Sequence, residues 1–167
     1  MIWDYSTNIT AQDIRTLIDV WRSVIGQMNA ITNVTNAGDA LIPVWPENVK
    51  ADPGQLSQQL IGLRDTINQR RVSLRTLDTN YRRFPNVEST LNEVIKDDTI
   101  GRLYRALDSF ATEVRGVTKP PPENFEETLR PYAGELKGAL NSMALSASQT
   151  RTFANRQIDE LSNIKIK

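Results

Sequence analysis

The chain has 167 residues, with 20 lysines and arginines against 20 aspartates and glutamates, and it contains neither cysteine nor histidine. This length is typical of one domain with a substantial core, and the balanced charge argues against a global attraction to nucleic acid or anionic membrane. Without cysteine and histidine, disulfides, thiolate nucleophiles, imidazole bases and Cys/His metal sites are excluded. We therefore expect no catalytic residues, no cofactor and no metal.

The N-terminal sequence MIWDYSTNIT has neither the basic nor the apolar stretch of a secretory signal. No apolar run approaches the roughly 18 residues needed to span a bilayer. We therefore expect a protein that is not secreted by a signal peptide, has no membrane partner, and is cytoplasmic or located within an assembled particle.

The first predicted helix begins after Thr10 and ends near Asn33. Thr10 and Asp13 have the spacing of a capping box. Apolar residues then recur at helical intervals, at Ile14, Leu17, Ile18, Trp21, Val24, Ile25, Met28 and Ile31. The following segment, 35–54, contains glycine and proline and has no helical period, yet it is apolar. We interpret it as a long apolar loop that crosses one end of a bundle and buries Trp45 there.

The second predicted helix runs from Pro53 to Phe84, with Asp52 as its capping residue and proline at its first position. Its apolar residues alternate in steps of four and three over about four heptads, as in a coiled coil. The third predicted helix, 87–117, loses this rhythm at KDDTIG, residues 96–101. We expect a kink or short interruption there.

The segment TKPPPEN, residues 118–124, is a clear break, and the last predicted helix extends from Asn124 to Ser162. Three long helices and a shorter one predict an all-α, antiparallel four-helix bundle with coiled-coil-like heptads. The alternative is an extended coiled coil that completes its core by oligomerising. Residues 1–167 form one domain in this interpretation, with extensions at 1–9 and 163–167.

Arg70 occupies a position on the second predicted helix where the heptad pattern requires an apolar residue. If the second and third helices fold back near Pro85, residues whose numbers add to about 171 face each other. Arg70 would then lie opposite Gly101 and beside Asp97 and Asp98, and we hypothesise a structural ion pair with one of these aspartates. Two alternatives are a guanidinium that reaches water at the margin of the seam and one that binds an external acidic partner.

The second predicted helix also carries an excess of basic residues, namely Arg64, Arg70, Arg71, Arg75, Arg82 and Arg83, against two aspartates. Arg71, Arg75 and Arg82 fall near one outward face, which could hold phosphates, acidic protein or RNA. The alternative is an ordinary solvated face with i,i+4 ion pairs. These arginines are not regularly interleaved with aromatic residues, and no glycine-rich loop or basic tail accompanies them, so nucleic acid is only weakly supported as a partner.

The two ends of the chain carry apolar side chains that could contact a partner or, alternatively, pack on the bundle of their own chain: Trp3, Tyr5, Ile164 and Ile166. The alternating end SNIKIK has the pattern of a strand that adds to a partner's sheet. We therefore expect a non-enzymatic structural or adaptor subunit that packs against other protein subunits, or against itself, in a virus particle or similar complex. The alternatives are nucleic-acid or acidic-ligand binding by the arginine face, and a helical regulator of the toxin or immunity type.

Overall fold

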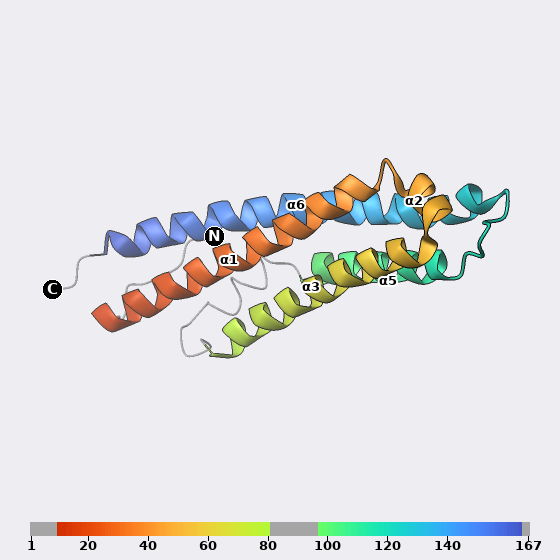
Figure 1. Ribbon diagram of the computed structural model, residues 1–167. Helices are drawn as coiled ribbons and strands as arrows, with labels where there is room; N and C mark the ends of the chain where they lie inside the picture. The colour runs from red at the N-terminus through yellow and green to blue at the C-terminus, as the bar shows by residue number, and fades with distance from the viewer. Residues whose placement is uncertain (1–9, 81–96, 165–167) are drawn as a thin grey trace.

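The structure, a computed structural model, describes residues 10–80 and 97–164. Every regular element in these two ranges is a helix, which confirms the all-α class (Figure 1). The helices are α1 (Ala11–Leu41), α2 (Trp45–Ala51), α3 (Pro53–Asn80), α5 (Asp97–Arg115) and α6 (Phe125–Ser162).

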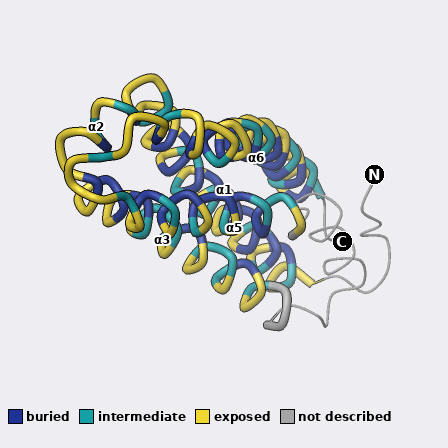
Figure 2. The backbone as a smooth tube through the Cα atoms, turned by 90° about the vertical axis from the view of Figure 1, so that its right-hand side faces the viewer, coloured by how far each residue is buried: buried dark blue, intermediate teal, exposed yellow. Residues whose placement is uncertain are grey.

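The four long helices form a ring in which α1 packs against α6 and α3, and α5 packs against α3 and α6. The short α2 lies at one end and contacts α3. α1 and α6 run antiparallel, because Gly38 lies against Leu140 while Trp21 lies against Phe153. Buried residues line the inward faces of these helices, and exposed residues line the outside (Figure 2). The core therefore runs along the axis of an elongated molecule.

The N-terminus of α1 is capped as predicted. The Asp13 amide donates to Thr10 Oγ1 and the Thr10 amide donates to Asp13 Oδ2, each at 3.1 Å, which completes a capping box. The predicted end near Asn33 is wrong, because α1 continues to Leu41. Thr35 and Gly38 keep the buried face in register beyond Ile31, but neither residue looks apolar in the sequence.

The predicted long apolar loop over 35–54 is also wrong. This segment forms the last turns of α1 and the whole of α2. Its three prolines mark helix boundaries instead. Pro43 follows α1, Pro46 lies in the first turn of α2, where its missing N–H costs no hydrogen bond, and Pro53 is the first residue of α3.

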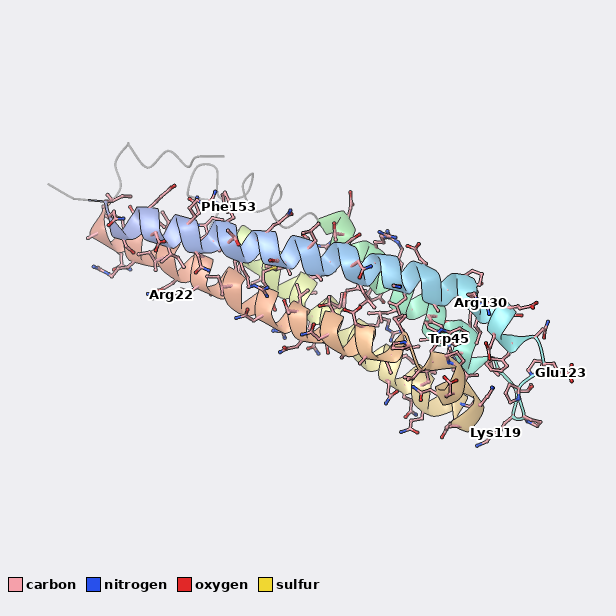
Figure 3. The ribbon with its side chains drawn as sticks, turned by 90° about the horizontal axis from the view of Figure 1, so that it is seen from above. Arg22, Trp45, Lys119, Glu123, Arg130 and Phe153 are labelled. Carbon is pink, nitrogen blue, oxygen red and sulfur yellow. The ribbon has the colours of Figure 1, made fainter. Side chains whose placement is uncertain are left out.

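The burial of Trp45 is confirmed, with 7% of the residue exposed. Its ring meets Phe110 of α5 edge to face, with 5.7 Å between ring centroids. Trp45 lies toward the same end of the molecule as Lys119 and Glu123 (Figure 3). The predicted capping role of Asp52 is confirmed as well, because its Oδ1 accepts the Gln55 amide at 3.1 Å. The chain thus turns between α1 and α3 through one packed helix.

The hairpin of α3 and α5 is antiparallel, close to the predicted register. Arg64 faces Asp108 and Arg71 faces Gly101, so facing residue numbers add to 172 where about 171 was predicted. The predicted helix start at 87, the segment before Asp97 and the predicted end of the second helix at Phe84 lie outside the described residues. α6 begins at Phe125, within one residue of its prediction, and ends at Ser162 as predicted.

Candidate anion-binding site on the outer face of α5

Two faces of α5 differ sharply in composition. Its inward face holds fully buried apolar side chains, namely Ile100, Leu103, Leu107, Phe110 and Val114. Its outward face carries Arg102, Arg105 and Asp108, which the helical repeat places toward α6, toward solvent and toward α3 respectively. The core packing of α5 therefore presents charged side chains to both neighbouring helices.

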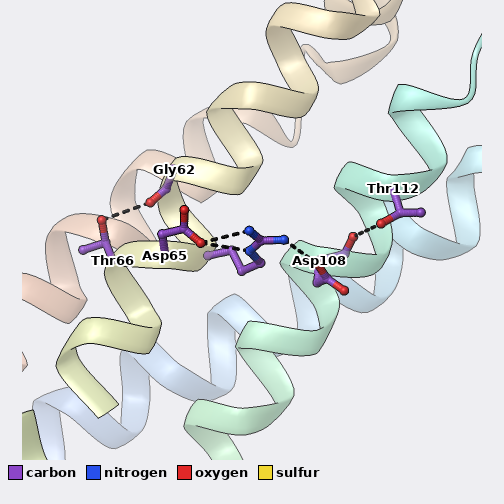
Figure 4. Close-up of polar contacts among 6 residues, drawn as sticks. Gly62, Asp65, Thr66, Asp108 and Thr112 are labelled. Atoms are coloured by element: carbon purple, nitrogen blue, oxygen red, sulfur yellow. Dashed lines mark hydrogen bonds and ion pairs between the residues drawn. The ribbon is translucent and has the colours of Figure 1, made fainter. Parts of the chain in front are cut away.

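On the α3 side, Arg64 joins the two helices through a two-carboxylate contact (Figure 4). Its Nη1 donates to Asp108 Oδ1 of α5 at 2.6 Å, and its Nε and Nη2 donate to Asp65 Oδ1 at 3.1 and 3.0 Å. The hydrogen bond that Arg64 donates to Asp108 is the main cause that raises the pKa of Arg64 above its ordinary value. The side chain of Arg64 is 25% exposed, so this contact lies at the margin of the core.

On the α6 side, hydrogen bonds to Glu135 and Ser142 hold Arg102 in place. Its Nε donates to Glu135 Oε1 at 2.8 Å, its Nη2 to Glu135 Oε2 at 3.4 Å, and its Nη1 to Ser142 Oγ at 3.1 Å. A Cβ on Gly138 would lie 2.9 Å from Arg102 Nη2, so the glycine leaves room for the guanidinium. The hydrogen bond from Arg102 lowers the pKa of Glu135 below its ordinary value. The donors of Arg102 are thus committed to α6.

Between these two ion pairs, the guanidinium groups of Arg71 and Arg105 converge over Gly101. A Cβ at Gly101 would lie 3.1 Å from Arg105 Nη1 and 3.7 Å from Arg71 Nη2. Two cations from different helices therefore approach the same point, which is unfavourable unless solvent or an anion lies between them. Within the described part of the chain, Arg105 has neither a hydrogen-bond nor an ion-pair partner. Arg71 makes a further interaction of its own.

Arg105 also borders a groove of about 410 Å³ between α5 and α6. The groove is lined by Arg102, Arg105, Ala106, Ser109, Pro131, Tyr132 and Glu135. Tyr132 is half-buried, whereas Arg105 and Ser109 are exposed. The groove combines a short apolar wall with hydroxyl and guanidinium donors, so it can hold an anionic group that is attached to a small apolar or aromatic group.

The sequence prediction reached this surface in part. Arg71 and Arg75 lie on α3, half-buried and exposed respectively, while Arg82 lies outside the described residues. Arg105 and Tyr132 were missed. The one available signal was the register that placed Gly101 against α3, because Arg105 follows Gly101 by one helical turn.

Arg70 turns away from this surface toward α1. Its Nη1 donates to Gln27 Oε1 at 3.2 Å. Its Nε is buried and has no hydrogen-bond partner in the described ranges. Asp98 is exposed, and the side chain of Asp97 lies outside the described residues. The ion pair of Arg70 with Asp97 or Asp98 therefore stays a prediction.

Of the four partner-contact residues predicted at the chain ends, only Ile164 lies within the described residues. Ile164 is half-buried and packs against the hydrophobic core of its own chain, whereas Trp3, Tyr5 and Ile166 lie outside the described residues. Over the two described ranges, no group of three or more acidic side chains could hold a metal ion. None of the described helices is long and apolar enough to cross a bilayer.

No family model matches the chain, and no significantly similar curated protein or solved structure was found. Function must therefore be argued from the geometry of the chain itself.

Proposed function

We propose that this protein is a non-enzymatic binding module, built as an antiparallel four-helix bundle, that docks onto other protein subunits of a larger assembly. A virus particle or similar complex is the most specific form of this proposal. The observation that carries it is the α5–α6 groove, where Tyr132 and Arg105 stand beside a small apolar wall. Tyrosine and arginine are the side chains that most often dominate the energy of protein interfaces.

The surroundings of the groove support docking because they are held in place before any partner arrives. Arg102 is fixed to Glu135 and Ser142 of α6, and Arg64 is fixed to Asp108 of α5. A surface that is already ordered loses little conformational entropy when it binds, which favours affinity. The outer face of α5 is therefore better suited to contact a partner than an equally exposed but unanchored helix face.

The test is quantitative affinity capture from the native source, followed by cross-linking mass spectrometry. We expect Tyr132→Ala to weaken recovery of the cognate subunit by at least about tenfold, as for an interface hot spot. Arg22→Ala is the matched control, because Arg22 is an exposed α1 side chain remote from the groove, with 69% of its side chain accessible. Lys137 is an exposed residue of α6. Cross-links from Lys137 to the partner should disappear in Tyr132→Ala together with binding.

Equal recovery by Tyr132→Ala, Arg22→Ala and the unchanged protein would contradict the proposed docking surface. A second candidate function, nucleic-acid binding by the arginine face, is favoured by the convergence of Arg71 and Arg105 over Gly101. It predicts binding that falls steeply with added salt, and the experiments of the next subsection separate the two.

A further inference from the structure

We infer that the point over Gly101, between Arg71 and Arg105, binds a carboxylate of an acidic protein segment, while a neighbouring apolar side chain of that segment lies in the α5–α6 groove. This inference rests on the proposed docking function and adds the chemistry of the partner. Arg105 connects the two halves of the site, since its Nη1 lies over Gly101 and its side chain lines the groove.

The geometry over Gly101 fits a carboxylate. Glycine has no Cβ, so the two guanidinium groups lie close together over the backbone of residue 101, where an added Cβ would be 3.1 Å from Arg105 Nη1 and 3.7 Å from Arg71 Nη2. A guanidinium and a carboxylate form short, charge-assisted hydrogen bonds that are frequently bidentate.

Arg105 is the donor on which the inference depends. In contrast to Arg64 and Arg102, whose donors are engaged by Asp108 and Glu135, Arg105 makes no polar contact with the described residues. A carboxylate that binds Arg105 therefore does not have to displace an internal partner. The cost of desolvation is also small, because Arg105 is exposed.

The charges around the site favour an acidic protein segment over a nucleic acid. Asp108 and Glu135 flank the two arginines on the α3 and α6 sides, and Asp98 is exposed on α5 just before Gly101. A phosphate backbone carries a charge at every nucleotide and would pass close to these carboxylates. A protein segment with one or two carboxylates can place them beside the two arginines and keep its uncharged residues next to the flanking Asp108 and Glu135.

The size and lining of the groove indicate what accompanies the carboxylate. A volume of about 410 Å³ lies at the lower end of ligand sites, which are about 300–1,000 Å³. Ala106, Pro131 and the ring of Tyr132 form its apolar wall. One leucine or phenylalanine side chain close to the carboxylate would fill much of this space.

Fluorescence anisotropy with the full chain tests the inference. The probe is a labelled peptide with a single glutamate next to a leucine among neutral residues, compared with the same peptide carrying glutamine for glutamate. We expect the acidic peptide to bind at least about tenfold more tightly, because each charge-assisted hydrogen bond adds substantially to affinity. Arg105→Gln should weaken the acidic peptide by about the same factor and leave the glutamine peptide unaffected.

Gly101→Ala separates loss of the site from loss of the fold. Its methyl group would lie 3.1 Å from Arg105 Nη1 and would push the paired guanidinium groups apart from their present positions, so acidic-peptide binding should fall about as much as in Arg105→Gln. The same change should raise stability, because alanine has a higher helix propensity than glycine. Gly26→Ala is the matched control: it lies on α1 with no atom within 4 Å of its added Cβ, and it should leave peptide binding unchanged.

The inference would be overturned by equal affinity for the two peptides, by undiminished binding in Gly101→Ala, or by a single-stranded RNA oligonucleotide that binds more tightly than the acidic peptide. Displacement of the peptide by millimolar inorganic phosphate would also overturn it, since the site would then hold a simple anion. If Tyr132→Ala loses the native partner while Gly101→Ala retains it, the docking function stands and only this inference fails. If the acidic peptide binds but Tyr132→Ala recovers as much of the native partner as the unchanged protein, the carboxylate site stands and the proposed docking function fails.

Discussion

The α1–α6 pair and the α3–α5 hairpin are both antiparallel, but they differ in their main contacts. The α1–α6 pair is packed mainly through small and apolar residues, with Arg151 Nη1 of α6 also donating to Thr32 Oγ1 of α1. In the α1–α6 pair, Gly38 lies directly against Leu140, and the ring of Trp21 meets Phe153 with 5.6 Å between centroids. In the hairpin, polar contacts cross between the helices: Ser57 Oγ donates to the Ala111 carbonyl oxygen at 2.9 Å, and Arg64 bridges to Asp108.

This difference determines where the molecule can tolerate change. Close apolar packing leaves no room to move, so added atoms in the α1–α6 pair must displace buried side chains. Long polar side chains at the margin of the hairpin can swing into solvent, because their flexible ends are partly exposed. A binding surface can therefore vary on the α3–α5 side without loss of the core, and the part of the proposed site over Gly101 lies there.

The largest expected effect comes from removal of a core ring on the α1–α6 side. Trp21 is fully buried, so Trp21→Ala should lower the free energy of unfolding by about 3–5 kcal/mol. Urea denaturation followed by circular dichroism would measure the change. The neighbouring exposed substitution Arg22→Ala should stay within about 0.5 kcal/mol of the unchanged protein. A loss below about 1 kcal/mol for Trp21→Ala would show that this pair is loosely packed.

Gly38→Ala should be the next largest effect. The new Cβ would lie 2.6 Å from Leu140 Cδ2 and 3.0 Å from Cδ1, and Leu140 is fully buried. We expect a loss of about 1–3 kcal/mol from overpacking, in spite of the better helix propensity of alanine. In a Leu140→Ala background the same change should become neutral or stabilising, because the clash is removed. A loss unaffected by that background would place the strain elsewhere.

The helices whose apolar rhythm is carried by large side chains could be predicted from the sequence. α6 and the start of α3 were placed within a residue, and the capping residues Thr10 and Asp52 were identified correctly. The end of α1 was missed because close helix packing there uses Thr35 and Gly38. A small or polar residue that is buried for steric reasons looks the same in a sequence as one that begins a loop.

The candidate site was only half predictable for a related reason. The basic bias of the second predicted helix indicated Arg71, but the arginines of α5 are outnumbered by acidic residues and form no basic pattern. Arg105 belongs to the candidate site only because the register of the hairpin brings its guanidinium group and that of Arg71 close to Gly101. A difference of one residue between the predicted and observed register replaces Arg70 by Arg71 at that point. Side-chain convergence across helices depends on tertiary packing, which periodicity alone does not specify.

A glycine on the hairpin should respond in the opposite direction to Gly38. The Cβ of Gly101→Ala meets only guanidinium ends, which can move outward at little cost. The helix propensity of alanine should then raise the free energy of unfolding by about 0.5–1 kcal/mol. Gly26→Ala, which meets no atom within 4 Å, provides the size of the propensity gain alone. If Gly101→Ala were destabilising, the two sides of the molecule would be equally intolerant and the comparison would fail.

The smallest expected effect is the pH dependence of the α5–α6 contact. Arg102 lowers the pKa of Glu135 in the folded state through its hydrogen bonds, so the folded chain holds this proton less tightly than the unfolded chain. Stabilisation by Glu135 is thus fully present above the ordinary carboxyl pKa of about 4.5 and is lost as the pH falls through the lowered value. The effect is small because 56% of the Glu135 side chain is exposed to solvent screening.

Urea denaturation of the unchanged protein and of Glu135→Gln at two pH values would measure this contribution. At pH 7 the unchanged protein should be the more stable of the two, and at pH 3 the difference should shrink. High salt should reduce the difference at pH 7 as well, because it screens exposed charges. A difference that is equal at both pH values would mean that Glu135 acts through packing, and the α5–α6 contact would then resemble the α1–α6 pair.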